Sequence, residues 1–130
     1  MDINTYGHGA TAEAVVRLSA DEAKAMAKFV NLAMPFMRNH AAECHASADE
    51  LADCFHAEQA RFKASRDFGN EREAREHQHN MANYVRDWGK ASGEADDAEY
   101  AIEAAAKVRH ALELFVATAR RGGQEEEERA

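Results

Sequence analysis

Five residues with metal-binding side chains fall on the apolar faces that helical periodicity assigns to this chain. His40 and Cys44 are one turn apart, Cys54 and Glu58 are one turn apart, and His77 lies within the next apolar stripe. Residues one turn apart share a face of a helix. Imidazole, thiolate and carboxylate groups together suit zinc or iron. If neighbouring helices are antiparallel, the five side chains face one region of the bundle. This arrangement would make the chain a metal-binding helical bundle.

The same residues have a simpler interpretation, which we favour. A buried histidine that is hydrogen-bonded to a buried glutamate satisfies both groups without a metal ion, and a free cysteine behaves as a small apolar residue. The segment from Cys44 to His56 matches no known zinc spacing. We therefore expect a buried polar cluster and no cofactor, with the metal centre as the alternative.

A stripe of basic side chains is expected on the outer face of the helix predicted from residue 71 to about residue 88. Its members lie within about 60° of one another and opposite Met81 and Trp88. Such a stripe suits contact with an acidic partner or with phosphates, and a solvated surface is the plainer explanation. The residues are Arg72, Arg75, His79, Arg86 and Lys90.

The composition is that of one acidic, alanine-rich domain of 130 residues with a net charge of −8. This charge argues against broad nucleic-acid binding. Two cysteines do not make a disulfide framework. No apolar run approaches the ~20 residues that span a bilayer, and no signal peptide is evident. These features predict a cytoplasmic protein with no membrane contact.

Start and stop signals predict an all-α antiparallel bundle of about four main helices plus a short N-terminal helix. The tetrapeptide Ser-Ala-Asp-Glu occurs at residues 19–22 and 47–50, and each copy reads as a capping box. Gly69-Asn70, the stretch from Gly89 to Gly93, and Gly122-Gly123 read as stops. The expected helices cover residues 12–18, 20–46, 48–68, 71–88 and 95–121.

The expected faces and boundaries carry further predictions. The apolar face of the first long helix holds Met26, Phe29, Val30, Ala33, Phe36 and Met37. Pro35 either bends this helix or breaks it. Residues 1–121 are predicted to form a single helical domain, and residues 122–130 a disordered acidic tail.

No nucleophile–base pair, phosphate loop or paired-carboxylate site is recognisable in the sequence. We therefore expect a non-enzymatic protein-interaction module that acts on the surface of a protein partner, as an inhibitor, adaptor or assembly factor. An inhibitor of the anti-CRISPR kind is an example by size and charge alone. A homodimer is a further expectation, with contacts through Tyr6, Phe68, Tyr100 and Leu114.

Overall fold

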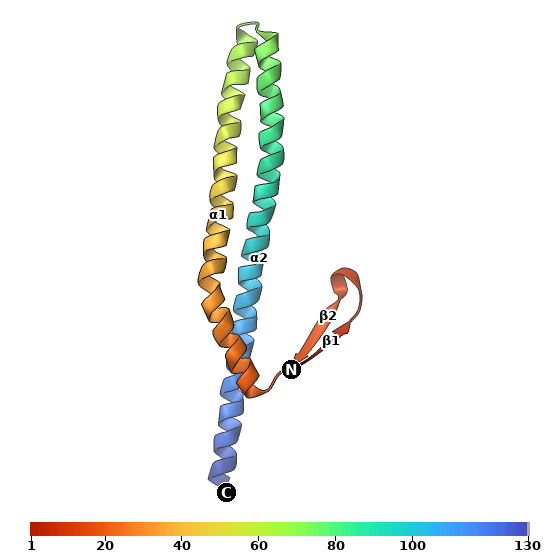
Figure 1. Ribbon diagram of the computed structural model, residues 1–130, viewed down its shortest axis with the longest axis vertical. Helices are drawn as coiled ribbons and strands as arrows, with labels where there is room; N and C mark the ends of the chain where they lie inside the picture. Colours follow the sequence, from red (N-terminus) through yellow and green to blue (C-terminus); the bar gives the residue numbers. More distant parts are fainter. Residues whose placement is uncertain (130) are drawn as a thin grey trace. The chain divides into compact units, whose positions relative to one another are not determined.

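The computed structural model describes residues 1–129, apart from the side chain of residue 125. The chain begins with a β-hairpin of β1 (Asp2–Tyr6) and β2 (Glu13–Arg17), with a 3-10 turn, η1 (Gly9–Thr11), between the strands. Two long helices follow, α1 (Ala20–Asp67) and α2 (Glu71–Arg129) (Figure 1). No helix among the described residues is both long and apolar enough to cross a membrane.

The chain forms two compact units, and both long helices contribute to each. We call Met1–Pro35 together with the chain from Glu103 onward the terminal unit, and Phe36–Ile102 the turn unit. The terminal unit holds the β-hairpin, the start of α1 and the last part of α2. The turn unit holds the rest of both helices and the connection between them.

The prediction of four main helices is wrong, because α1 and α2 each join two of the expected segments. Residues 47–50 lie inside α1 and start no new helix, since the alanines around them favour helix strongly. Pro35 also lies inside α1, so it does not break the helix. Gly89 and Gly93 do not end α2.

In the turn unit, the positions at which α1 and α2 pack together recur at alternating spacings of three and four residues. We call these positions the seam, and their regular recurrence explains why neither helix is interrupted. This alternation is the heptad pattern of two helices packed along their length. On α1 the seam contains Met37, Ala41, Cys44, Ala48, Leu51, Phe55, Glu58, Phe62 and Ser65. On α2 it contains Ala74, His77, Met81, Tyr84, Trp88, Ala91, Ala95, Ala98 and Ile102. All of these positions except Trp88 are buried or half-buried.

The terminal unit has a small core between the start of α1 and the last part of α2. Ala23, Ala27 and Leu112 are buried there, and Leu18, Met26 and Val116 pack against them. Arg109 Nη1 donates a hydrogen bond to Asn31 Oδ1 across the two helices. Two of the three buried residues of this core are thus alanines.

The connection between α1 and α2 is a tight turn closed by backbone hydrogen bonds. The amide of Asn70 donates to the carbonyl of Ser65, and the amide of Gly69 donates to the carbonyl of Arg66. Gly69 has a φ of 73°, the left-handed conformation that this helix ending requires. Asn70 then caps α2, because its Oδ1 accepts from the amide of Glu73. The predicted stop at Gly69-Asn70 is confirmed.

The predicted capping box at the start of α1 is also confirmed. The amide of Glu22 donates to Ser19 Oγ, and the amide of Ser19 donates to Glu22 Oε1, both at 3.2 Å. The terminal ammonium of Met1 lies 2.9 Å from Glu22 Oε2. This ammonium and Ser19 hold the pKa of Glu22 below its ordinary value.

A β-hairpin takes the place of the predicted short helix at residues 12–18. The strands are antiparallel, with Ile3 opposite Val16 and Asp2 opposite Arg17. The β-branched pair Val15-Val16 favours a strand. Gly7 and Gly9, both with positive φ, reverse the chain between the strands. Every residue of both strands is exposed.

The large apolar side chains of the first predicted helix do not all face inward. Phe29 is 71% exposed and Phe36 is 76% exposed, whereas Met26, Val30, Ala33 and Met37 are half-buried. The buried positions in this part of α1 are mostly alanines instead. The assignment of the two phenylalanines to the buried face is therefore wrong.

Gly89 and Gly93 lie inside α2, although glycine destabilises a helix relative to alanine. A Cβ at Gly89 or Gly93 would meet no atom within 4 Å. A glycine within a helix costs roughly 0.5–1 kcal/mol relative to alanine. Gly122 and Gly123 also lie within α2, which continues to Arg129 instead of ending near Arg121. The predicted division at residue 121 into a domain and a disordered tail stays a prediction.

Replacing Gly69 with alanine should destabilise the fold, because an L side chain in the left-handed conformation costs about 1–2 kcal/mol. We expect G69A to lower the midpoint of thermal unfolding, followed by circular dichroism. The control is G122A, whose glycine lies in a helix with open space around it. An unchanged midpoint in G69A would contradict the role given to this turn.

Candidate functional site

Glu58 is the centre of a polar cluster within the seam of the turn unit. Its Oε2 accepts a hydrogen bond from His77 Nδ1 at 2.7 Å, and its Oε1 accepts from Arg61 Nη1 at 2.9 Å. Asn80 Nδ2 donates to the same carboxylate at 3.5 Å. The side chain of Glu58 is only 8% exposed, so these contacts replace most of its hydration. The carboxylate accepts, so the proton of the His77 ring lies on Nδ1.

The charge state of Glu58 follows from these partners. The hydrogen bond from His77 is the largest cause that holds the pKa of Glu58 below its ordinary value of 4.5. Arg61 and Asn80 act in the same direction, and burial acts against them. Glu58 is therefore ionised at neutral pH and orients the ring of His77. A histidine held by a carboxylate can act as a base that activates a neighbouring nucleophile. The other side chains that contact Glu58 here are those of Arg61 and Asn80, and neither is a nucleophile.

The five candidate metal ligands do not come together at one place in the structure. Besides the pair of Glu58 and His77, His40 Nε2 lies 3.6 Å from Cys44 Sγ, with His40 exposed and Cys44 buried. Cys44 and Glu58 are about 20 Å apart along the same helix, at 1.5 Å per residue. Cys54 is half-buried and free. Among the described residues, no group of three or more His, Cys, Asp or Glu side chains could hold a metal ion.

The basic stripe lies on the exposed surface of α2, as its sequence pattern predicts. Arg72 approaches Glu76 and Arg86 approaches Asp87, each at 3.7 Å. Arg75 Nε donates to the carbonyl of Glu71 at 3.4 Å. His79 and Lys90 are exposed as well. These long contacts in water hold the side chains weakly, so the stripe can rearrange around a partner.

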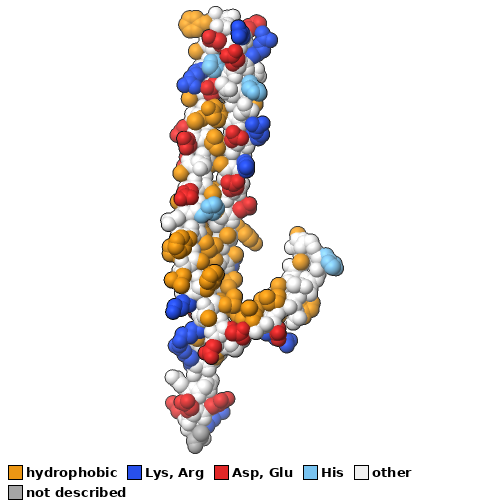
Figure 2. Space-filling view, in the orientation of Figure 1, with side chains coloured by type: hydrophobic (Ala, Val, Ile, Leu, Met, Phe, Trp, Pro, Cys, Tyr) orange, Lys and Arg blue, Asp and Glu red, His pale blue; other side chains and the backbone are white. Residues whose placement is uncertain are grey.

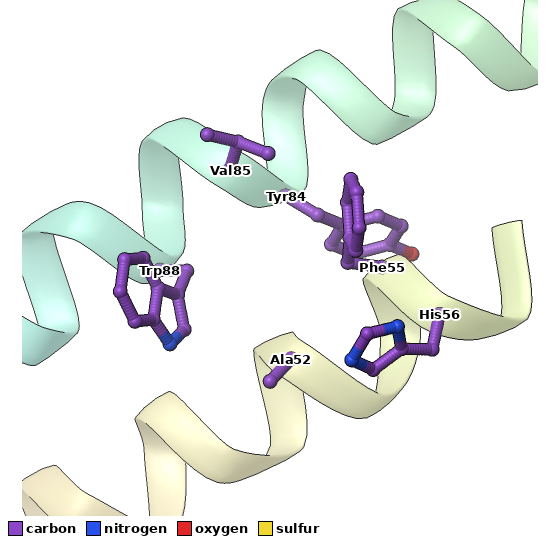
Figure 3. A pocket seen from close by; sticks show the side chains of 6 residues that line it. All are labelled: Ala52, Phe55, His56, Tyr84, Val85 and Trp88. Carbon is purple, nitrogen blue, oxygen red and sulfur yellow. The ribbon is translucent and has the colours of Figure 1, made fainter. Parts of the chain in front are cut away.

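An apolar groove of about 310 Å³ opens between α1 and α2 in the turn unit. Figure 3 shows side chains from both helices around it, with Tyr84, Val85 and Trp88 on α2 and Ala52, Phe55 and His56 on α1. Trp88 remains 44% exposed and Val85 52% exposed. Both side chains are thus large, apolar and open to contact from outside.

Sequence reasoning misses this groove because the apolar stripes place Phe55, Tyr84 and Trp88 in a closed interior. The signal that could have revealed it is the small size of their neighbours. Ala52 leaves space beside the rings, which a larger residue would fill.

Large apolar side chains are also exposed in the terminal unit. Phe29 and Leu32 on α1 are 71% and 64% exposed, and Leu114 on α2 is 59% exposed. A groove of about 370 Å³ lies between the end of β2 and α2, lined by Val16, Arg17, Leu18, Ala111, Leu112 and Phe115. Figure 2 shows hydrophobic side chains at the surface of both helices and of the hairpin. Scattered single residues are ordinary on a protein surface, but this clustering is not.

No protein-family model, curated protein or solved structure matches this chain.

The hydrogen bonds of Glu58 predict a dependence of stability on pH. A carboxyl group whose pKa is lowered in the folded state stabilises that state above its unfolded pKa and loses this contribution as the pH falls through the folded value. We expect E58Q to lower the free energy of unfolding by about 1–2 kcal/mol at pH 7. The difference from the wild type should shrink as the pH falls below 4.5.

Urea unfolding at a series of pH values, followed by circular dichroism, measures this effect. The matched control is E50Q, because Glu50 is an exposed glutamate on the same helix. A difference between E58Q and the wild type that stays constant from pH 7 to pH 3 would show that Glu58 does not act through its charge.

Proposed function

We propose that this protein is a non-enzymatic interaction module that acts by binding a macromolecular partner, as an inhibitor, adaptor or assembly factor. One observation carries the proposal: most buried positions of the helices are alanines, whereas many of their large apolar side chains are exposed. No large side chain among the described residues is fully buried. Exposed apolar surface of this extent is typical of a protein that a partner covers.

The terminal unit supplies the surface that we propose for the partner. Phe29 and Leu32 share the outer side of α1, opposite the seam positions Ala23 and Ala27. Between Ala23 and Pro35 the only charged residues are Lys24 and Lys28. This combination suits a protein surface or helix that presents apolar side chains flanked by aspartate or glutamate. The overall acidity of the chain argues against nucleic acid as that partner.

The basic stripe of Arg72, Arg75, His79, Arg86 and Lys90 is proposed as a second contact surface. Its support is its exposure and the weakness of its internal ion pairs. We also propose a cytoplasmic location. Two free cysteines, Cys44 and Cys54, are consistent with a reducing compartment.

Recovery of a partner from an extract of the native organism tests the role of the terminal unit. We expect tagged wild-type protein to retain a stoichiometric macromolecule, and the double variant F29S/L32Q to retain at least tenfold less. Loss of central apolar anchors typically weakens an interface by this much or more. Serine and glutamine have helix propensities close to those of phenylalanine and leucine, so α1 should persist.

The matched control for this experiment is F68S, which removes another exposed phenylalanine, at the turn between the helices. F68S should retain the partner as well as the wild type does. Equal retention by F29S/L32Q and the wild type would refute the proposed surface. Recovery of no stoichiometric macromolecule would refute the function itself.

A further inference from the structure

Aromatic rings dominate the lining of the groove between α1 and α2 in the turn unit. Phe55 and His56 on α1 and Tyr84 and Trp88 on α2 all line it (Figure 3). The groove measures about 310 Å³, at the lower end of the size range of small-molecule pockets. Trp88 is 44% exposed, so the groove is open to a ligand from solvent. The faces of aromatic rings carry partial negative charge and attract cations.

The charged side chains beside the groove are acidic. On a helix surface, residues three or four positions apart are neighbours, whereas residues one or two positions apart do not face each other. Arg86 is one position from Val85 and Lys90 is two positions from Trp88, so both belong to the outer face of α2. The charged residues three or four positions from a lining residue include no lysine or arginine, and they are Asp49, Asp53, Glu58 and Asp87.

Asp49 and Asp53 are the carboxylates of this set that are available to a ligand. Glu58 is buried and already accepts hydrogen bonds from its own donors, and Arg86 lies 3.7 Å from Asp87. Asp49 and Asp53 are exposed, and within the described part of the chain neither forms an ion pair. They therefore place two negative charges on the α1 side of the groove.

The scarcity of hydrogen-bond acceptors in the lining decides which kind of cation the groove suits. Among the lining side chains only Tyr84 and His56 carry an acceptor atom, because the indole of Trp88 is a donor alone. A primary ammonium has three N–H donors and is strongly hydrated, so it loses more in this groove than it gains. A quaternary ammonium has no N–H group, and its methyl groups can pack against the rings.

We propose that this groove binds a small molecule that carries a quaternary ammonium group. The ammonium group lies against the aromatic rings, while Asp49 and Asp53 attract it from the α1 side. Ala52 supplies the room, because its small side chain leaves open the space that the ligand fills. Every residue of this site belongs to the turn unit, so the proposal does not depend on the surface that we propose for the terminal unit.

Titration with choline tests the proposal, followed by the NMR signal of the indole N–H of Trp88, the single tryptophan of the chain. Two compounds that share the hydroxyethyl group of choline serve as comparisons. The neutral analogue 3,3-dimethylbutan-1-ol has carbon in place of the charged nitrogen, and ethanolamine has a primary ammonium. We expect choline to bind roughly three- to thirtyfold more tightly than the neutral analogue, the size of a cation–π contribution. Ethanolamine should give no saturable shift.

A steric variant tests whether the ligand occupies the groove itself. A52L should weaken choline binding roughly tenfold or more, because the larger side chain fills the space beside the rings. The matched control is A57L, which places the same side chain at an exposed position on the outer side of α1. Leucine favours helix, so both variants should keep the helix content of the wild type by circular dichroism.

A charge variant tests the part of the two aspartates without altering the groove. D49N/D53N should weaken choline binding about threefold, a modest effect because water and salt screen exposed carboxylates. Its binding of 3,3-dimethylbutan-1-ol should not change. The control is D67N/D97N, which removes two exposed carboxylates of the turn unit that do not neighbour the groove. If A52L fails to fold, this variant and the comparison of ligands decide.

Three results would each overturn the proposal: no saturable shift with choline, a neutral analogue that binds as tightly as choline, or unchanged choline binding by a folded A52L variant. Titration with a peptide that carries trimethyllysine and with phosphatidylcholine vesicles distinguishes the source of the ammonium group. Binding of either at least tenfold more tightly than choline would refute a free small molecule as the ligand. None of these results bears on the recovery of a partner by the terminal unit, so the two proposals fail separately.

Discussion

The close packing of two helices through small side chains is the constraint on which the rest of the structure depends. In the turn unit, Ala41, Cys44 and Ala48 lie near the level of Ala91, Ala95 and Ala98, as the contact between His45 and Glu99 indicates. Small residues at these positions let the helix backbones approach closely. They also bury little apolar area per residue. Several large apolar side chains, among them Phe29, Leu32 and Phe36, lie outside the buried face and are exposed.

A seam of alanines specifies its register poorly, because one alanine fits about as well as the next. Glu58 and His77 supply the missing specificity, since a shift by one turn would separate the buried carboxylate from His77 and Asn80. Breaking a buried pair of this kind is costly, whereas an apolar pair at the same place can be equally stable or more stable. The value of the pair therefore lies in fixing which residues of α1 and α2 meet, as single polar residues do in coiled coils. The tight turn at Gly69 acts in the same direction from one end of the turn unit.

Local signals in the sequence predict local structure well here, and they fail where long-range packing decides. The capping box at Ser19 and the stop at Gly69-Asn70 are correct because each depends on hydrogen bonds within a few residues. The box at residues 47–50 and the glycines near residue 90 fail because seam positions on both sides hold the helix together. Hydrophobicity alone assigns Phe29 and Phe36 to the interior, whereas the seam repeats every 3.5 residues on average and passes through alanines. The contact between Glu58 and His77 follows from their placement in apolar stripes, but the groove beside Trp88 requires the spacing of the helices.

The thin core also links folding to binding. The interior contributes little per residue, so the apolar side chains left outside hold a large share of the burial energy available to this chain. Covering them with another surface favours the folded state by mass action, since the unfolded chain presents no such ordered surface. The β-hairpin illustrates the point, because an isolated two-stranded sheet with every residue exposed is marginally stable at best in water. A partner on the terminal unit would add burial that the chain cannot supply alone. Stability and interaction are therefore two consequences of the same alanine-rich packing.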